Sequence, residues 1–224
     1  MSSTGIVLYG TDFSPCVRAV KLTLKALNVD YEYKEVNLQT GEHLSEEFLK
    51  KNPQHTVPVL DDNGTFLWDS HAIATYLVDK YGKSDELYSK DLVKRAIIDQ
   101  RLYFDASVIF PGLHNIVAPF WSRGVTEVSQ EKLDTVHRGL ALLETFLVSS
   151  PYLVGDSLTL ADLLTGPTVT GLRAAVDIEP AVYPKITAWL ERLYQIPYYK
   201  EIDEAPVQAY IALLRSKWTK LGDK

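Results

Sequence analysis

Ser14 and Cys16 are two side chains near the start of the chain whose types and positions could support chemistry. Residues 6–8 are apolar and predict a short strand. Ser14-Pro15 predicts the start of a helix, because serine is a favoured N-cap and proline is tolerated at the first helical position. The Ser14 hydroxyl should then lie beside unpaired N–H groups at the positive end of a helix dipole, which suits an anion. A serine that only caps the helix is the simpler interpretation of these residues alone.

Cys16 is the single cysteine of the chain, so no intramolecular disulfide can form. Such cysteine usage is typical of a reducing compartment. A thiol in the first turn of a helix can have a lowered pKa, but a small side chain packed near the sheet is the commoner role. We predict that Cys16 is not catalytic, with a regulatory thiol or a thiol oxidoreductase as the alternative.

The overall composition argues against several classes of protein. The formal net charge is −6 at pH 7 and the chain has no basic cluster, so binding to nucleic acid or to an anionic membrane is not expected. The N-terminus lacks the charged and apolar regions of a signal peptide, and no apolar run is long enough for a transmembrane helix. These features predict a cytoplasmic globular protein, for which 46% hydrophobic residues provide an ordinary core.

The elements that would position Ser14 alternate between strand and helix. After Ser14, apolar residues at steps of three and four predict a helix that stops near Asn28. Residues 31–36 alternate in the manner of a half-buried strand, and residues 44–49 suggest a short helix. The first strand, the first helix and the second strand form a βαβ unit, which is right-handed with parallel strands.

A hairpin and a third helix complete this part of the chain. Asn63-Gly64 lies between two apolar runs, which is a strong hairpin signal. A helical stripe then follows Ser70 and ends at Gly82. The predicted order of elements over residues 1–82 is therefore βαβ–α–ββα.

After a linker at residues 83–90 the pattern changes to helices alone, and no strand is predicted from Lys90 onward. Pro111-Gly112 should kink or end the first of these helices. Thr159 and Asp162 have the spacing of a capping box at the start of another helix. The other predicted helical ranges are 92–110, 130–148, 183–194 and 206–218.

Several short motifs occur in order along nearly the whole chain. They include Ser14-Pro15 followed by Arg18-Ala19-Val20, Asn52-Pro53-Gln54-His55-Thr56-Val57-Pro58, Ser70-His71-Ala72-Ile73 and Leu158-Thr159-Leu160-Ala161-Asp162. Each motif is weak by itself, but their order and spacing resemble those of the cytosolic glutathione S-transferases. The resemblance is to the insect delta/epsilon type, and most of all to the epsilon class.

The resemblance implies an α/β plus all-α fold. It implies a thioredoxin-like βαβ–α–ββα domain that binds glutathione at residues 1–82, a linker at 83–90, and a helical-bundle domain at 91–224 that contributes the acceptor-substrate site. It also implies a homodimer, glutathione as co-substrate and no metal.

The implied activity is conjugation of the glutathione thiolate to hydrophobic electrophiles, a detoxification reaction, and the same thiolate could reduce organic hydroperoxides as a peroxidase. A non-catalytic carrier of hydrophobic ligands, or an interaction module of the same fold, is the alternative. Retention of Ser14 favours the enzyme. An oxidoreductase based on Cys16 is disfavoured, because a serine stands at position 14, where omega-class relatives have their cysteine.

By resemblance, Ser14 donates a hydrogen bond to the glutathione sulfur and stabilises its thiolate. A free cysteine thiol has a pKa of about 8.5, and lowering it by two units requires about 2.7 kcal/mol. A hydrogen bond to a charged acceptor contributes roughly 1.5–3 kcal/mol, and a helix N-terminus adds roughly 0.3–1 kcal/mol. One hydroxyl at one helix start is therefore of the right size for this task.

The resemblance also assigns a set of glutathione-binding residues, which are His43, His55, Thr56, Val57, Pro58, Asp69, Ser70 and His71. Val57-Pro58 resembles a cis-proline turn that presents the Val57 backbone to the glutathione cysteine, with an ordinary trans proline at a strand start as the alternative. Ser70 would bind the glutamyl carboxylate at a helix N-terminus. Asp69, one methylene shorter than the glutamate of many relatives, would meet the glutamyl ammonium. Judged from the residues alone, Asp69 and Ser70 are instead a capping pair at the start of a helix.

The histidines of this set could contact glutathione, bind a metal or simply lie in surface loops. His55 resembles a glutathione-contacting histidine, and His43 resembles a second one near the glycyl end. Two histidines invite a metal interpretation, but no further ligand stands at a suitable spacing, so no metal site is predicted. Surface loop residues are the simpler alternative. His71 follows Ser70 and either contacts glutathione or faces away from the site.

The acceptor substrate is expected between the domains, because apolar pockets favour domain interfaces. The candidate walls are Phe110, Leu113, His114, Val117, Phe120 and Trp121, with Phe13, Leu38 and Tyr210 opposite. About half of these residues are expected to be core residues of the helical domain instead. Relatives often have arginine where His114 stands, so a histidine there could make the polarity near the sulfur pH-dependent.

Overall fold

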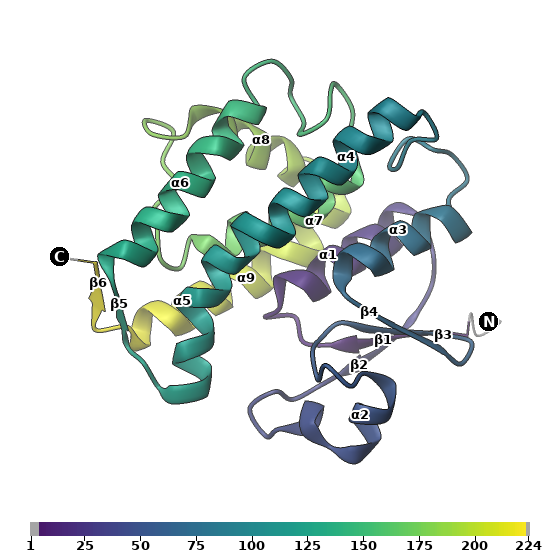
Figure 1. The fold of residues 1–224 in the computed structure, drawn as a ribbon, viewed down its shortest axis with the longest axis horizontal. Coiled ribbons are helices and arrows are strands. Elements are labelled where there is room, and N and C mark those ends of the chain that lie inside the picture. Colours follow the sequence, from purple (N-terminus) through teal and green to yellow (C-terminus); the bar gives the residue numbers. More distant parts are fainter. Residues whose placement is uncertain (1–4, 223–224) are drawn as a thin grey trace.

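The computed structural model of the chain describes residues 5–222. It consists of a four-stranded sheet with helices on both faces and an array of helices packed on one side of it (Figure 1). The helices α1 (Pro15–Ala26) and α3 (Ser70–Tyr81) lie between the sheet and the helical array, while α2 (Glu46–Lys51) covers the other face. The predicted combination of an α/β domain and an all-helical domain is confirmed.

The sheet has the strand order β2-β1-β3-β4. Its strands are β1 (Ile6–Gly10), β2 (Glu32–Glu35), β3 (Val59–Asp62) and β4 (Thr65–Trp68), and a 3-10 turn at Glu42–Leu44 precedes α2. β1 and β2 are parallel, and the other two pairs are antiparallel. The predicted βαβ–α–ββα order is therefore confirmed. Asn63 and Gly64 both have positive φ, 53° and 89°, as a type I′ hairpin turn requires.

One end of this sheet gathers three connecting segments. Val59, at the start of β3, lies opposite both Tyr9 near the end of β1 and Trp68 at the end of β4. The loop after β1, the loop before β3 and the turn after β4 therefore leave the sheet at the same end. These segments contain Ser14, Val57-Pro58 and Asp69-Ser70.

α1 begins and ends close to its predicted limits. Ser14 is its N-cap and Pro15 is its first residue, as the sequence predicts. Val17, Val20 and Leu24 are fully buried in a core that they share with the sheet. This packing fixes the helix, and with it the position of its first turn, against β1.

The helical array is built around α7 (Leu160–Leu172), every residue of which is buried. The predicted capping box of Thr159 and Asp162 is present at its start. α7 packs against α1, α4, α5 and α9. The surrounding helices are α4 (Leu92–Phe104), α5 (Phe110–Arg123), α6 (Gln130–Phe146), α8 (Pro184–Tyr194) and α9 (Pro197–Lys217).

The prediction that the last helix starts at Pro206 is wrong, because α9 begins at Pro197 and Pro206 lies inside it. The sequence offers two prolines, and both suit a helix start. The buried positions decide between them: they already recur at steps of three and four before Pro206. They are Tyr199, Asp203, Val207, Tyr210 and Leu214.

Two further expectations for the helical part need correction. Of the two alternatives for Pro111-Gly112, a kink or an end, the end is wrong: a π-helical segment at Asp105–Ile109 joins α4 to α5, and the helical path continues to Arg123. Such π segments accommodate irregularities within helices. The expectation of no strand after Lys90 is wrong for β5 (Glu127–Val128) and β6 (Lys220–Leu221), which pair in parallel. Strands of two residues are too short to show an alternating pattern.

Within residues 5–222, none of the helices combines the length and the apolar character that a bilayer span requires.

Candidate functional site

Ser14 lies at the strand-to-helix corner that the sequence predicts. Its Oγ accepts a hydrogen bond from the Val17 amide at 3.4 Å, and its own amide donates to the Thr11 carbonyl at 3.0 Å. The side chain is partly exposed. Because the hydroxyl accepts from the helix, its own hydrogen is free to be donated to an external acceptor. The corner therefore offers one O–H donor next to the positive end of α1.

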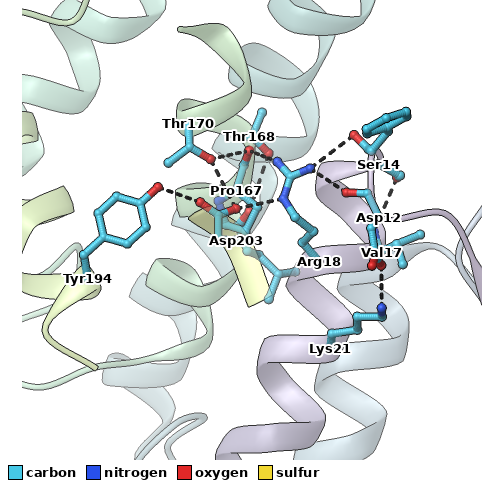
Figure 2. Close-up of polar contacts among 12 residues, drawn as sticks. Asp12, Ser14, Val17, Arg18, Lys21, Pro167, Thr168, Thr170, Tyr194 and Asp203 are labelled. Carbon is cyan, nitrogen blue, oxygen red and sulfur yellow. Dashed lines mark hydrogen bonds and ion pairs between the residues drawn. The ribbon is translucent and has the colours of Figure 1, made fainter. Parts of the chain in front are cut away.

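The loop that leads to Ser14 is held by Arg18, one turn further along α1. Arg18 Nη1 donates to the carbonyls of Asp12 at 2.9 Å and Phe13 at 3.2 Å. Figure 2 shows the guanidinium between Asp12 on one side and Asp203 of α9 on the other. Sequence reasoning missed the role of Arg18. The available signal was a charged residue beside the apolar stripe of α1, where charged side chains are rarely buried without a partner.

The segment before β3 presents Val57 and Pro58, joined by a cis peptide bond as the resemblance implies. The side-chain amide of Asn52 donates to the Thr56 carbonyl at 2.9 Å and to its hydroxyl at 3.0 Å, which fixes this loop. β3 begins only at Val59. The amide and carbonyl of Val57 therefore lie outside the sheet ladder, where an extended ligand could pair with them.

His43 and His55 lie side by side, with ring centroids 6.3 Å apart. Burial, and then the neighbouring His55, lower the pKa of His43. Nδ1 of His43 is buried and has no hydrogen-bond partner among residues 5–222. No group of three His, Cys, Asp or Glu side chains suited to a metal ion occurs in that part of the chain. The unpartnered Nδ1 of His43 is thus available to a polar ligand group.

Asp69 caps α3. Its Oδ1 accepts from the amides of His71 at 2.9 Å and Ala72 at 3.1 Å. The side chain is nevertheless largely exposed, so its other oxygen can meet a cation. Asp69 and His55 have positive φ angles of 71° and 48°. Such angles are uncommon for residues other than glycine and are enriched at functional sites.

Ser70 is buried beside Asp69, and His71 faces the helical part. His71 Nε2 lies 3.1 Å from Oδ2 of Asp105, in the π-helical segment, and its Nδ1 lies 3.5 Å from Ser70 Oγ. Thr168 donates to the same Asp105 oxygen at 3.5 Å. Burial raises the pKa of Asp105, although His71 opposes this shift. Both ring nitrogens of His71 therefore face groups of the protein, Ser70 on one side and Asp105 on the other.

Asp105 was not singled out from the sequence. It follows Ile98 and Leu102 and precedes Ile109 at steps of three and four, and all four residues are buried. An acidic residue on an apolar stripe was the signal that could have identified it.

Cys16 is partly buried and contacts Ser70. Burial raises the pKa of its thiol to about 12, against the opposing effect of a hydrogen bond with Ser70. The thiolate is the reactive form of cysteine. The structure therefore keeps Cys16 protonated near neutral pH, which disfavours the oxidoreductase alternative.

The expected acceptor-site residues separate into two groups. Leu113, Val117 and Tyr210 are at least nine-tenths buried and belong to the helical core, so Leu113 and Val117 cannot form an open wall. The exposed or partly exposed group consists of Phe13, Leu38, Phe110, His114, Phe120 and Trp121. The ring of Phe13 contacts that of Tyr210 with centroids 6.1 Å apart, and Phe110 stacks on His114 at 5.7 Å.

An open cavity of about 560 Å³ lies between α5 and the start of α6. His114 borders it, but its other lining residues are mainly polar and include Asn115, Arg123 and Lys132. None of the predicted glutathione-binding residues lines this cavity. It is therefore separate from the corner at Ser14.

Comparisons with known proteins agree on one family. Residues 8–85 match the family model described as glutathione S-transferase, N-terminal domain, and residues 109–197 match the one described as glutathione S-transferase, C-terminal domain. Glutathione S-transferase 1 of Manduca sexta is 46% identical over 200 residues, which cover 88% of this chain and 91% of that protein.

Solved structures give the same result. An epsilon-class glutathione S-transferase from the housefly, Musca domestica, is 52% identical with a TM-score of 0.92, over 95% of this chain and 98% of that one. A glutathione transferase homologue from Drosophila mojavensis, solved with bound glutathione, is 46% identical with a TM-score of 0.92, over 96% of this chain and 98% of that one.

Proposed function

The chain belongs to the glutathione S-transferase family, with insect epsilon-class enzymes among its relatives, and on this premise we propose that Ser14 is the residue that holds the glutathione thiolate during conjugation. The single observation that carries the assignment is the Ser14 hydroxyl, which accepts from the Val17 amide and keeps its hydrogen free. A hydroxyl in this state is a donor to an anionic sulfur.

The proposed mechanism follows from the corner itself. On binding, the glutathione thiol loses its proton to solvent, and Ser14 donates its O–H to the resulting thiolate. The positive end of α1 adds to this stabilisation. The thiolate then attacks an electrophilic carbon and forms a carbon–sulfur bond, while the leaving group departs with the bonding electron pair. The protein contributes thiolate stabilisation and the proximity of the two reactants.

The remainder of glutathione extends along the three segments at this end of the sheet. The Val57 backbone pairs with the cysteinyl residue, next to Thr56 and the cis Val57-Pro58 bond. The glutamyl carboxylate lies at the start of α3 against Ser70, and the free oxygen of Asp69 meets the glutamyl ammonium. The glycyl carboxylate is taken by His43 and His55, whose rings are adjacent. His71 acts through Ser70.

The acceptor site is formed by the aromatic and apolar side chains that stay accessible. These are Phe13, Leu38, Phe110, His114, Phe120 and Trp121. Tyr210, Leu113 and Val117 support this wall from the core. Such a surface favours hydrophobic electrophiles, in keeping with a detoxification role, and the same thiolate could reduce organic hydroperoxides.

We further propose the domain division at residues 1–82, 83–90 and 91–224, and a homodimer. α4 exposes the large apolar side chains of Leu92, Val93 and Ile97, and such patches commonly mark an interface. Light scattering on the purified protein tests the dimer. We also propose a cytoplasmic location, because the chain has a single cysteine and so cannot form an intramolecular disulfide, which is typical of proteins in a reducing compartment.

Conjugation of glutathione to chlorodinitrobenzene at slightly acid pH tests the role of Ser14. We expect Ser14→Ala to lower kcat by roughly 10²-fold, as for loss of one donor to a developing anion, with glutathione still bound in calorimetry. Ser14→Thr, which keeps a hydroxyl, is the matched control and should recover much of the rate. Glutathione binding without turnover above that of Ser14→Ala would contradict the assignment and would favour a carrier of hydrophobic ligands.

A further inference from the structure

Arg18 connects the loop before Ser14 to the helical part of the molecule. Its side chain is fully buried, as is that of Asp203 on α9. Arg18 Nε donates to Asp203 Oδ1 at 2.8 Å, and Nη2 donates to the Pro167 carbonyl of α7 at 3.1 Å. On the other side, Nη1 donates to the carbonyls of Asp12 and Phe13 at 2.9 and 3.2 Å. The one guanidinium therefore joins the α/β domain to two helices of the other domain (Figure 2).

The carboxylate that receives Arg18 is itself fixed from two more directions. Thr170 of α7 donates to Oδ1 of Asp203 at 3.3 Å, and the Tyr194 hydroxyl of α8 donates to Oδ2 at 2.9 Å. A buried carboxylate with all these donors has little freedom to move. Arg18 is thus anchored to a rigid point of the helical domain.

The two loop carbonyls that Arg18 binds immediately precede Ser14. The carbonyl of Phe13 and the amide of Ser14 belong to the same planar peptide unit. Holding that carbonyl therefore sets the orientation of the backbone at Ser14. It also sets the position of the Phe13 ring, which contacts Tyr210 of α9 at 6.1 Å.

We propose that Arg18 is a positioning residue for the conjugation reaction: it holds the Asp12 and Phe13 carbonyls against the helical domain and thereby directs the Ser14 hydroxyl at the glutathione sulfur, an inference that rests on the function proposed for Ser14. Docking of the two domains then determines the geometry of the thiolate site. Only arginine suits this place, because its planar fork serves several acceptors at once, whereas lysine offers a single charged point.

Arg18→Lys is the first variant to examine, because it keeps the charge beside Asp203 and gives up the loop carbonyls. The thiolate absorbance of bound glutathione, followed against pH in the enzyme–glutathione complex, gives the pKa of the bound thiol. We expect this pKa to rise by about one unit, which is a tenfold fall in the acid dissociation constant of the bound thiol, with a lower kcat at neutral pH and little change in glutathione Kd. Tyr194→Phe is the matched control. It removes one bond to Asp203, leaves the Arg18 contacts in place, and should leave the thiol pKa unchanged.

The same titration in a Ser14→Ala background separates positioning from other roles. If Arg18 acts through Ser14, Arg18→Lys adds no further shift once the hydroxyl is gone. An equal shift in both backgrounds, or a lower melting temperature with an unchanged thiol pKa, would overturn the proposal. A Ser14→Ala variant with the wild-type thiol pKa would instead remove the function proposed for Ser14 itself.

A second variant covers the case in which Arg18→Lys does not fold. Arg18→Gln/Asp203→Asn leaves no charge buried and removes the contacts to the loop carbonyls. The proposal expects the same raised thiol pKa in this variant. A wild-type thiol pKa would contradict it.

Discussion

Two buried aspartates, Asp62 and Asp203, each accept several hydrogen bonds, but they connect different parts of the molecule. Oδ2 of Asp62 accepts hydrogen bonds from the hydroxyls of Tyr76 at 2.8 Å and Tyr81 at 2.6 Å and from the Lys80 ammonium at 2.7 Å. All three donors belong to α3, so the cluster fastens the β3–β4 hairpin to a helix of the same domain. The cluster at Asp203 instead takes its donors from α1, α7 and α8 and spans both domains.

The location of each cluster decides what it contributes. Asp62 pairs with Ile6 at the beginning of β1, at the end of the sheet opposite to the loop that carries Ser14. Asp203 reaches that loop through Arg18. Similar chemistry therefore stabilises the fold at one end of the sheet and, in our proposal, also positions a reacting group at the other. Variants at the two clusters should both lower stability, but only one set should change the thiolate.

The largest effect is expected from removing one member of the interdomain ion pair. Arg18→Met leaves the Asp203 charge buried without its partner and should cost about 3–5 kcal/mol of unfolding free energy. The double variant Arg18→Met/Asp203→Leu removes both charges and should recover most of this loss. Urea denaturation followed by tryptophan fluorescence measures both.

The conjugation activity of the same double variant separates the effect of the ion pair on stability from its effect on the Ser14 loop. Because it still lacks the contacts to the Asp12 and Phe13 carbonyls, its conjugation rate should stay low although its stability has returned. A double variant as unstable as Arg18→Met would show that the buried charge is not what makes the single change costly. Full activity in the double variant would show that the two clusters do not differ in the way described.

A smaller effect is expected at the other end of the sheet. Asp62→Asn weakens the bonds from Tyr76 and Tyr81 and should lower the unfolding free energy by about 2 kcal/mol. The pKa of glutathione bound to this variant should equal that of wild type. A raised thiol pKa in Asp62→Asn would remove the distinction between the two clusters.

The pH dependence of stability is a second test of what the ionised Asp62 carboxylate contributes to the fold. Burial by itself would raise the pKa of this carboxyl, but hydrogen bonds from Lys80, Tyr81 and Tyr76 outweigh burial and lower it. Since the folded-state pKa lies below that of the unfolded chain, the contribution is present above the ordinary aspartate pKa of about 3.9 and is lost as the pH falls below it. The urea midpoint of wild type should therefore converge on that of Asp62→Asn in acid. A constant difference between the two midpoints across this range would contradict the account.

The smallest effect concerns Cys16, which lies on α1 but belongs to neither cluster. With a thiol pKa of about 12, it should react slowly with iodoacetamide at neutral pH in the folded protein and rapidly after unfolding. Mass spectrometry of the labelled chain measures both rates. Fast labelling of the folded protein, together with disulfide-exchange activity that Cys16→Ser abolishes, would contradict this expectation and would support an oxidoreductase based on Cys16.

Local patterns were enough to predict most of the N-terminal domain. The Ser14 cap, the Asn63-Gly64 hairpin and the end of α3 at Gly82 are set by residues close in sequence, and all three are confirmed. Pro206 misled the prediction of α9, because a proline inside a helix has the same sequence signature as a proline at a helix start.

The interdomain contacts could not be predicted in the same way. Arg18 and Asp203 are 185 positions apart in the chain, and His71 and Asp105 are joined across 34. In the sequence, each of these residues appears only as a polar or charged side chain on an otherwise apolar helix face. That pattern indicates burial but does not identify the partner. Leu113 and Val117 illustrate the reverse case. Their apolar character suits both a substrate wall and a core, and only the packing places them in the core.

The most direct test of the account is a crystal structure of this chain with bound glutathione. The account predicts the glutathione sulfur within about 3.5 Å of Ser14 Oγ, with Arg18 still bonded to the carbonyls of Asp12 and Phe13. A sulfur placed beside Cys16, or a Ser14 hydroxyl that makes no contact with the sulfur, would contradict it.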